Sequence, residues 1–151
     1  MDLELKGKVA IVTGASVGIG RVIATTLAAE GMRLVLVARR GELLNTLQQE
    51  LNKSGAATSL VIAKDLTEPN AGADIRDQVL AAFGGIDVLV NNAGGSRPLP
   101  IDAPEEAWTE AIELNFTAVR RLTHAFLPMM IERRNGRIIV SALRAHEDLR
   151  R

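Results

Sequence analysis

The stretch Val9-Ala10-Ile11-Val12-Thr13-Gly14-Ala15-Ser16-Val17-Gly18-Ile19-Gly20 decides the fold of this chain. Its apolar start predicts a buried strand, and its glycines predict a sharp turn into a helix. The N-terminus of such a helix presents free N–H groups and the positive end of a dipole, which together suit a dinucleotide pyrophosphate. The glycine spacing is G-x-x-x-G-x-G. Glycines also end strands and helices for structural reasons alone, so a purely structural turn is the alternative.

Five short apolar runs recur along the chain and are rich in Val, Ile and Leu. Their apolarity is continuous rather than alternating, which is typical of parallel strands covered on both faces. Helical patterns separate them, and this alternation predicts an α/β fold with a doubly wound parallel sheet. The five predicted strands cover residues 9–12, 34–37, 59–63, 86–90 and 137–140.

The helices are predicted from apolar residues that recur at steps of three and four. A fourth, longer helix is expected to start near Pro104 and to reach Arg133, with a bend at Pro128. The stripes of the first three helices are Ile19, Ile23 and Leu27; Leu44, Leu47 and Leu51; and Ile75, Val79, Ala82 and Phe83. The stripe of the fourth is Trp108, Ile112, Asn115, Val119, Leu122 and Phe126.

Composition narrows the function classes. At 151 residues one domain is expected, and 18 basic residues balance 18 acidic ones, so nothing indicates a nucleic acid or a membrane as partner. The sequence has no cysteine, which excludes disulfides and cysteine nucleophiles, and we expect no metal site. The charged N-terminus has no signal-peptide core, and no apolar run approaches the length of a membrane helix. We therefore expect a cytoplasmic protein.

Two arginines follow the second predicted strand, in Leu36-Val37-Ala38-Arg39-Arg40. An acid at this place binds the ribose 2′-OH of NAD, whereas an arginine accommodates the 2′-phosphate of NADP. Such a charge-assisted contact is worth about 1.5–3 kcal/mol. The alternative is that Arg39 and Arg40 only solvate a helix start, but cations are unfavourable at that end of a helix unless an anion is bound. NADP is therefore expected in preference to NAD.

Three further positions carry polar side chains at expected strand ends or inside a helix. The run Asn91-Asn92-Ala93-Gly94-Gly95 follows the fourth strand, where open α/β sheets bind ligands, although asparagines also serve as turn residues. Asp65 follows the third strand and is either an acceptor for an adenine amino group or a plain loop carboxylate. Asn115 lies in the stripe of the long helix, where a buried amide must find partners. It either supports a helix irregularity or organises a water.

Taken in order, these segments resemble the short-chain dehydrogenase/reductase family over residues 6 to about 140. The resemblance implies a Rossmann-like sheet of order 3-2-1-4-5 with the cofactor across the carboxyl ends of the strands. It also implies a role for Asn115 in anchoring a proton-relay water. The implied cofactor residues are Gly14, Ser16, Gly18, Ile19 and Gly20 for the pyrophosphate, Arg39 with Arg40 for the 2′-phosphate, Asp65 and Leu66 for adenine, and Asn91, Ala93 and Gly94 for the ribose side.

The chain also departs from the family. The resemblance implies a catalytic serine after the fifth strand and then a tyrosine and a lysine four residues apart. Here Ser141 stands one or two places early, no tyrosine is present, and no lysine follows; His146 is a conceivable acid only in a new geometry. The family fold continues for two more strands. We therefore expect an incomplete dinucleotide-binding domain over residues 1–141, truncated after the fifth strand, and an atypical charged tail over residues 142–151.

Three functions follow as hypotheses. The first is an NADP-dependent oxidoreductase that transfers hydride between NADP(H) and a small carbonyl or alcohol substrate, of which this chain is the cofactor-binding half. The second is a catalytically silent NADP(H)-binding module, and the third is a truncated product without function. An uncovered fifth strand and the apolar long helix favour self-association, so a homo-oligomer is expected.

Overall fold

The computed structural model describes residues 3–95 and 99–141, and its centre is a parallel sheet of five strands. The order is β3-β2-β1-β4-β5, which confirms the predicted order. Because every pairing is parallel, the carboxyl ends of all the strands lie along one edge of the sheet. The strands are β1 (Val9–Thr13), β2 (Arg33–Ala38), β3 (Ser59–Ala63), β4 (Val88–Asn91) and β5 (Arg137–Val140).

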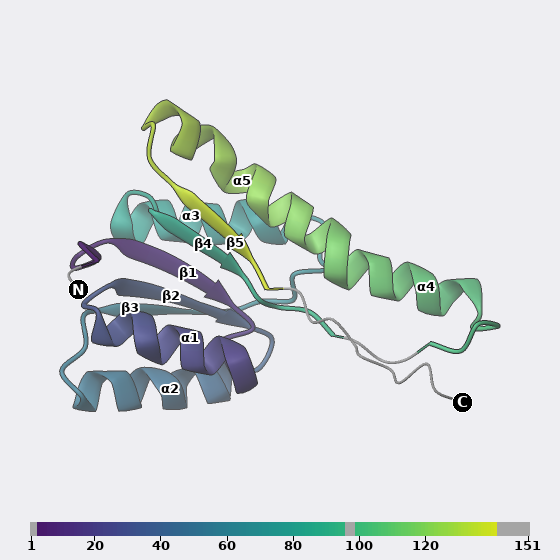
Figure 1. Ribbon diagram of the computed structural model, residues 1–151, viewed down its shortest axis with the longest axis horizontal. Coiled ribbons are helices and arrows are strands. Elements are labelled where there is room, and N and C mark those ends of the chain that lie inside the picture. The colour runs from purple at the N-terminus through teal and green to yellow at the C-terminus, as the bar shows by residue number, and fades with distance from the viewer. Residues whose placement is uncertain (1–2, 96–98, 142–151) are drawn as a thin grey trace.

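Helices cover both faces of the sheet (Figure 1), which confirms the doubly wound, Rossmann-like architecture. One layer holds α1 and α2, and the other holds α3 and α5. The long helix after β4, residues 105–132, forms one continuous rod that projects beyond the carboxyl ends of the strands. The helices are α1 (Gly18–Ala29), α2 (Gly41–Lys53), α3 (Ala71–Phe83), α4 (Glu105–Ile112), the π-helical turn η1 (Glu113–Thr117) and α5 (Ala118–Glu132).

Strand β1 shows why the apolar runs are continuous. Ala10 and Val12 belong to the core under α1 and α2, whereas Val9 and Ile11 belong to the core under α3 and α5. All four side chains are buried. A strand at the centre of a two-faced sheet has no solvated side, so alternation with polar residues would bury unpaired polar groups.

The expected stripe of α1 is wrong in its detail. Ile19 is half exposed, and the buried residues of the helix are Gly20, Ala24 and Ala28. Small side chains allow the helix axis to approach the sheet closely, so this face is selected for size rather than for hydrophobicity. In α3, Ile75 and Val79 are buried as predicted, but Ala82 is exposed.

The expected stripe of the long helix is correct only in α5. Leu122 and Phe126 are buried against the sheet, together with Ala118 and Met130. Trp108 and Ile112 are exposed, since α4 lies beyond the edge of the sheet (Figure 1). The sequence pattern is uniform along the rod, but the sheet lies under only its second half. Among the described residues no helix is long and apolar enough to cross a membrane.

Candidate dinucleotide-binding site

The carboxyl ends of β1 and β4 lie side by side at the point where the chain changes faces. After β1 the chain enters α1 in one helix layer, and after β4 it enters the rod that ends in α5 in the other. Ligands of open α/β sheets bind at such a switch point. The glycine turn, the two arginines and the Asn91–Gly95 run all follow strands at this edge.

Thr13 joins the two strand ends through its hydroxyl group. Its Oγ1 accepts hydrogen bonds from the N–H groups of Asn92 and Ala93, both at 2.9 Å, and donates to the carbonyl of Val90 at 3.2 Å. The Asn92 amide donates in turn to the Thr13 carbonyl at 3.2 Å. Neither Thr13 nor Asn92 was predicted as a functional residue, since the only signal in the sequence is their place beside the glycines. Together they determine where residues 92–94 lie relative to the glycine turn.

The three glycines of the turn meet different surroundings. A Cβ on Gly20 would lie 2.2 Å from the carbonyl oxygen of Gly14, and a Cβ on Gly14 would lie 3.0 Å from Cα of Ala93. These two glycines are therefore required by the packing of the chain on itself. Gly18 has a φ of +58° and no atom within 4 Å of an added Cβ. It is the glycine of the turn that borders open space at the start of α1.

No side chain caps the first turn of α1. The N-cap residue is Val17, whose side chain makes no capping hydrogen bond; Ser16 is buried and Ile19 is half exposed. Free N–H groups and the positive dipole end at a helix N-terminus suit an anion, and the binding of a pyrophosphate here remains a prediction. A pyrophosphate would thus meet backbone N–H groups beside Gly18, where a Cβ would take up the space.

Arg39 and Arg40 lie one strand away, between β2 and α2. Both are exposed, and they line an open depression of about 450 Å³ together with residues 41–43. Arg40 is the N-cap residue of α2, so a cation stands at the positive end of that helix. Glu42 in the first turn offsets part of this unfavourable charge. The pair is available to an anion of the size of a phosphate.

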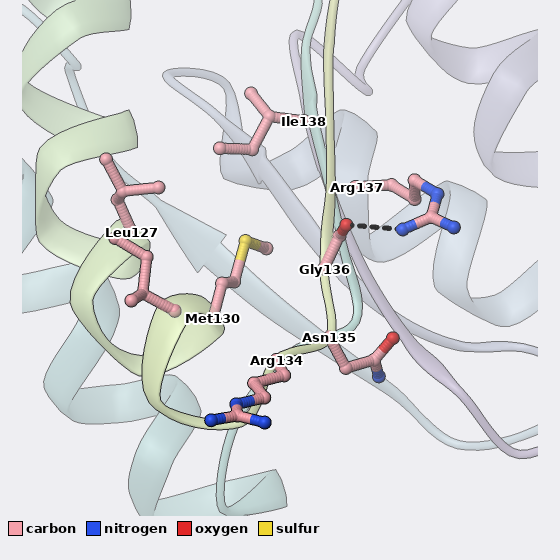
Figure 2. Close-up of a pocket in the computed structure, with 8 residues that line it drawn as sticks. Leu127, Met130, Arg134, Asn135, Gly136, Arg137 and Ile138 are labelled. Carbon is pink, nitrogen blue, oxygen red and sulfur yellow. Dashed lines mark hydrogen bonds between the residues drawn. The ribbon is translucent and has the colours of Figure 1, made fainter.

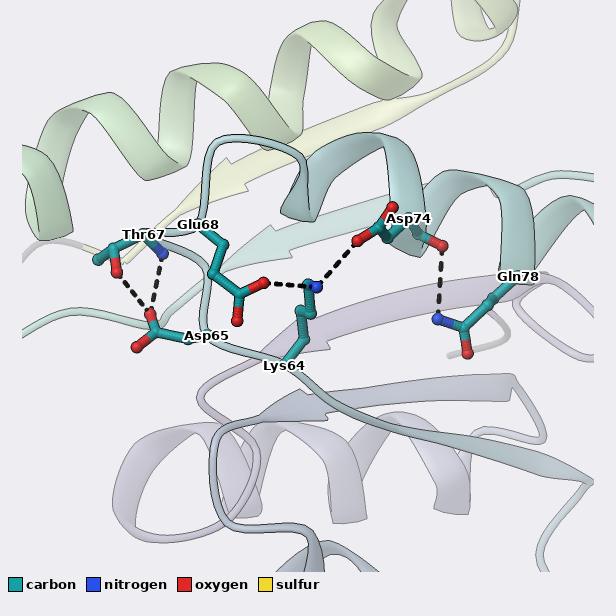
Figure 3. Close-up of polar contacts among 6 residues, drawn as sticks. All are labelled: Lys64, Asp65, Thr67, Glu68, Asp74 and Gln78. Carbon is teal, nitrogen blue, oxygen red and sulfur yellow. Dashed lines mark hydrogen bonds and ion pairs between the residues drawn. The ribbon is translucent and has the colours of Figure 1, made fainter.

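Asp65 closes a turn after β3. Its Oδ1 accepts hydrogen bonds from the N–H and the hydroxyl of Thr67, at 2.9 and 2.7 Å (Figure 3). These bonds from Thr67, first the backbone one, lower the pKa of the Asp65 carboxyl, and the positive charge of Arg39 lowers it further. Leu66 packs against the core under α3 and α5. Asp65 is thus an ionised turn residue near Arg39, and its contact with adenine remains a prediction.

The Asn91 side chain points into the protein. It is 2% exposed, and its amide donates to the hydroxyl of Thr123 in α5 at 3.1 Å. Ala93 is half-buried and Gly94 exposed, and both follow the Thr13 junction. The predicted contact of these three residues with the ribose remains a prediction. What the structure shows for the Asn91 amide is its hydrogen bond to Thr123, which joins β4 to α5.

Asn115 lies in η1, which confirms the expected helix irregularity. Its amide nitrogen donates to the carbonyls of Gly95 and Ala111, both at 2.9 Å, and its Oδ1 accepts from the Gly95 N–H at 3.1 Å. The expectation that Asn115 is buried is wrong, since the residue is exposed. A Cβ on Gly94 would lie 2.9 Å from Oδ1 of Asn115, so a side chain there would displace this hydrogen-bonded amide.

Ser141 lies at the end of β5, beside Asn91. Its N–H donates to the Asn91 carbonyl at 2.9 Å and continues the ladder between the two strands. The residue is half-buried, and its catalytic role remains a prediction. His146 and the charged tail, residues 142–151, lie outside the described residues.

A second hollow, of about 300 Å³, lies at the amino ends of the strands, between the end of α5 and the start of β5 (Figure 2). Figure 2 shows Leu127, Met130 and Ile138 on one side of β5 with Arg134 beside them, while the Arg137 side chain lies on the other side of the strand. Strand β5 begins at this edge, so the hollow is far from the strand ends that carry the candidate site. Within the described ranges no group of three or more His, Asp or Glu side chains is placed to hold a metal ion.

Comparisons with known proteins agree with this geometry. The short chain dehydrogenase family model matches residues 8–146. The chain is 38% identical to 3-oxoacyl-(acyl-carrier-protein) reductase FabG of Escherichia coli, over 91% of this chain and 55% of that protein. It superimposes on L-sorbose reductase of Gluconobacter frateurii, a complex with NADPH and L-sorbose, with a TM-score of 0.88 and 38% identity, over 93% of this chain and 54% of that one.

A further neighbour is a 7α-hydroxysteroid dehydrogenase in complex with NADH, with a TM-score of 0.88, 33% identity and coverage of 92% of this chain and 54% of that one. The fold and the glycine turn define a Rossmann-like protein. The chain belongs to the short-chain dehydrogenase family, whose members are oxidoreductases that use NAD(P). It spans about half the length of these relatives.

Proposed function

We propose that this chain carries the NADP(H)-binding part of a short-chain dehydrogenase/reductase, which transfers hydride between NADP(H) and a small carbonyl or alcohol substrate. The observation that carries the proposal is the open space at Gly18 before an α1 N-terminus without a side-chain cap, with two exposed arginines one strand away. An anionic dinucleotide needs both features, one for its pyrophosphate and one for its 2′-phosphate.

Each part of the cofactor is assigned to one segment of the carboxyl edge. NADP(H), when bound, supplies or accepts the hydride, and the residues of this chain hold it in place. The pyrophosphate is assigned to Gly14, Ser16, Gly18, Ile19 and Gly20, the 2′-phosphate to Arg39 and Arg40, adenine to Asp65 and Leu66, and the ribose side to Asn91, Ala93 and Gly94.

The preference for NADP over NAD is assigned to Arg39. The NADPH complex of L-sorbose reductase supports NADP, whereas the NADH complex of the hydroxysteroid dehydrogenase shows that the fold alone does not decide the preference. The decisive group is the guanidinium at the end of β2, because only NADP carries a phosphate there.

Titration of NADPH and NADH by their fluorescence tests the proposal. The wild-type chain should bind both saturably, with NADPH tighter. Arg39→Ala should weaken NADPH roughly tenfold to a hundredfold and NADH much less, since a charge-assisted hydrogen bond is lost only with NADPH. Arg120→Ala, which removes an exposed arginine from α5 in the other helix layer, is the control. Equal affinity for the two cofactors in the wild-type chain would refute the assignment of Arg39.

Asn115 and Ser141 are the proposed catalytic residues. Both are tied to the carboxyl end of β4: Asn115, in η1, bonds to Gly95 beyond that strand, and Ser141 bonds to Asn91 at its last position. In this proposal Asn115 anchors a water for proton transfer and Ser141 orients the substrate oxygen.

A second candidate is an NADP(H)-binding module without turnover. It is favoured by the composition, because the 151 residues contain no tyrosine to move the proton. Oxidation of NADPH in the presence of simple ketones separates the two candidates. Saturable binding without turnover by this chain supports the second, and turnover supports the first. A cytoplasmic location and self-association, argued from the sequence, remain part of the proposal.

A further inference from the structure

Three charged side chains meet where β3 passes into α3 (Figure 3). The Lys64 ammonium pairs with Glu68 at 2.6 Å and with Asp74 at 2.8 Å. Glu68 belongs to the loop after β3, and Asp74 belongs to the first turn of α3. The ion triad of Lys64, Glu68 and Asp74 therefore joins the end of a strand, a loop and a helix. The pairs with Asp74 and Glu68 raise the pKa of the Lys64 ammonium, so it stays charged.

The Lys64–Glu68 pair of the ion triad flanks the turn that holds Asp65. The carbonyl of Asp65 accepts a hydrogen bond from the Glu68 N–H at 3.2 Å, and its Oδ1 holds Thr67. The turn is thus fixed at one end by the Lys64 side chain and at the other by Glu68. Figure 3 shows Asp65 and Thr67 on one side of the Lys64 ammonium and Asp74 on the other.

The same lysine is also tied to the arginine segment. The Lys64 N–H donates to the carbonyl of Ala38, the residue before Arg39, at 2.9 Å. A Cβ on Gly41, just beyond the arginines, would lie 3.1 Å from Cβ of Ala63. The end of β3 therefore lies directly against the segment from Ala38 to Gly41. A shift of Lys64 would therefore displace both the Asp65–Thr67 turn and the segment from Ala38 to Gly41.

The ion triad adds little to the free energy of unfolding but restricts the position of the loop after β3. The carboxylate side chains of Glu68 and Asp74 are about half exposed, and ion pairs of this kind add little to global stability. Their effect is to tie the loop after β3 to the first turn of α3, in addition to the hydrogen bonds within the loop. This restriction raises the affinity of a ligand that needs the loop in one arrangement, because less ordering is left to occur on binding.

We propose that Lys64 is a positioning residue for the adenine end of the cofactor: by holding Glu68 and Asp74 together, it keeps the Asp65–Thr67 turn in the arrangement that receives adenine. The proposal rests on the proposed function, since it concerns the same cofactor. Adenine is common to NADPH and NADH, so Lys64 affects both. Arg39, in contrast, affects the difference between them.

The test compares Lys64→Met and Asp74→Asn, which change the charge of the chain in opposite directions. Both break the ion triad, so both should weaken NADPH and NADH by a similar factor, roughly tenfold, with an unchanged ratio between the two cofactors. A charge effect alone would weaken binding in K64M and tighten it in D74N, because the cofactor is an anion. Tighter binding in D74N, or unchanged affinity in K64M, would overturn the proposal.

Three controls complete the design. Lys64→Arg keeps a cation between the two carboxylates and should retain most of the affinity. Arg76→Met removes a cation that pairs with Asp77 on the surface of α3 and should change neither affinity. In an Asp65→Asn background, K64M should add little, because the residue that it positions is already altered; full additivity would contradict the proposal.

Two observations separate this proposal from the proposed function. A wild-type chain that binds neither nucleotide refutes the proposed function itself. A wild-type chain that binds both, with K64M and D74N unchanged, refutes only the role of Lys64. Far-UV circular dichroism checks that each variant is folded at the assay temperature, and D74N carries the test if K64M unfolds.

Discussion

At the scale of single residues, the glycines of the first turn separate into two groups. Gly14 and Gly20 allow the chain to pack on itself, and a Cβ at either would meet atoms of the same chain. Gly18 has open space in front of it. The φ of Gly18, +58°, already favours glycine, and the open space in front of it has room for the pyrophosphate of the proposed cofactor.

Gly18→Ala should therefore lower cofactor affinity more than it lowers stability. Alanine at a positive φ costs about 1–2 kcal/mol of stability. Gly55→Ala is the matched control, since Gly55 has a φ of +76° and likewise no atom within 4 Å of an added Cβ. Urea denaturation should give similar losses for both variants, whereas titration with NADPH should show a loss for G18A alone. Equal NADPH affinity in the two variants would remove Gly18 from the site.

At the scale of elements, two polar residues join strands that are far apart in the sequence. Thr13 joins the carboxyl ends of β1 and β4, and Asp87 joins the opposite ends of β1, β4 and β5. Both bond to backbone N–H groups that the sheet ladder leaves unpaired. Their contributions can be tested one edge at a time.

Thr13→Val keeps the shape of the side chain and removes the hydroxyl that accepts from Asn92 and Ala93. The free energy of unfolding should fall by about 1–3 kcal/mol, because partly buried donors lose their acceptor. NADPH affinity should fall as well, since residues 92–94 lose their anchor. Thr13→Ser keeps the hydroxyl and should restore most of both quantities. A valine variant with wild-type affinity would show that the anchor is not needed for binding.

Asp87→Ala should lower stability and leave the NADPH affinity unchanged. Asp87 Oδ2 accepts from the buried N–H of Val9 at 2.9 Å, and Oδ1 accepts from the Asn135 amide at 2.9 Å. Loss of a hydrogen bond to a charged group costs about 1.5–3 kcal/mol, measured by urea denaturation. Asp77→Ala, on the surface of α3, should stay within about 0.5 kcal/mol of wild type. A loss of NADPH affinity in D87A would contradict this, since it would mean that a change at the amino ends of the strands reaches the site at their carboxyl ends.

At the scale of the whole molecule, many of the exposed apolar side chains lie on the rod and on β5. Trp108, Ile112 and Phe116 are 42%, 55% and 64% exposed, and Ile139 and Val140 of the edge strand are each more than half exposed. Surfaces of this kind favour association.

We expect the chain to self-associate through this surface. Sedimentation velocity at rising concentration should show species larger than the monomer of 16.2 kDa. Ile112→Lys together with Phe116→Glu should shift the distribution toward monomer, because each places a charge in an apolar contact. Val22→Lys, at an exposed position of α1, is the control. A wild-type chain that stays monomeric at high concentration would contradict the expectation.

The family resemblance implied the strand order. The sequence by itself determined the apolar strands, the glycine turn and the two arginines at the end of β2. These features are local: a continuous apolar run, a glycine at a turn and a residue that follows a strand are readable within about ten positions. The exposed faces of α1 and α4 could not be read in this way, because burial depends on which surface lies opposite each helix. Ile19 and Asn115 carry the same pattern as buried residues and are nevertheless exposed.

Only the tertiary structure decided the contacts that hold the site together. Thr13 and Ala93 are 80 positions apart, and Asp87 reaches Val9 across 78 positions. No periodicity links such residues, because the parallel crossovers bring strand ends together whatever lies between them in the chain. The same holds for Lys64, whose backbone contacts the end of β2 while its side chain contacts α3. The glycine turn is therefore encoded locally, whereas its neighbours at the carboxyl edge are assembled by the fold.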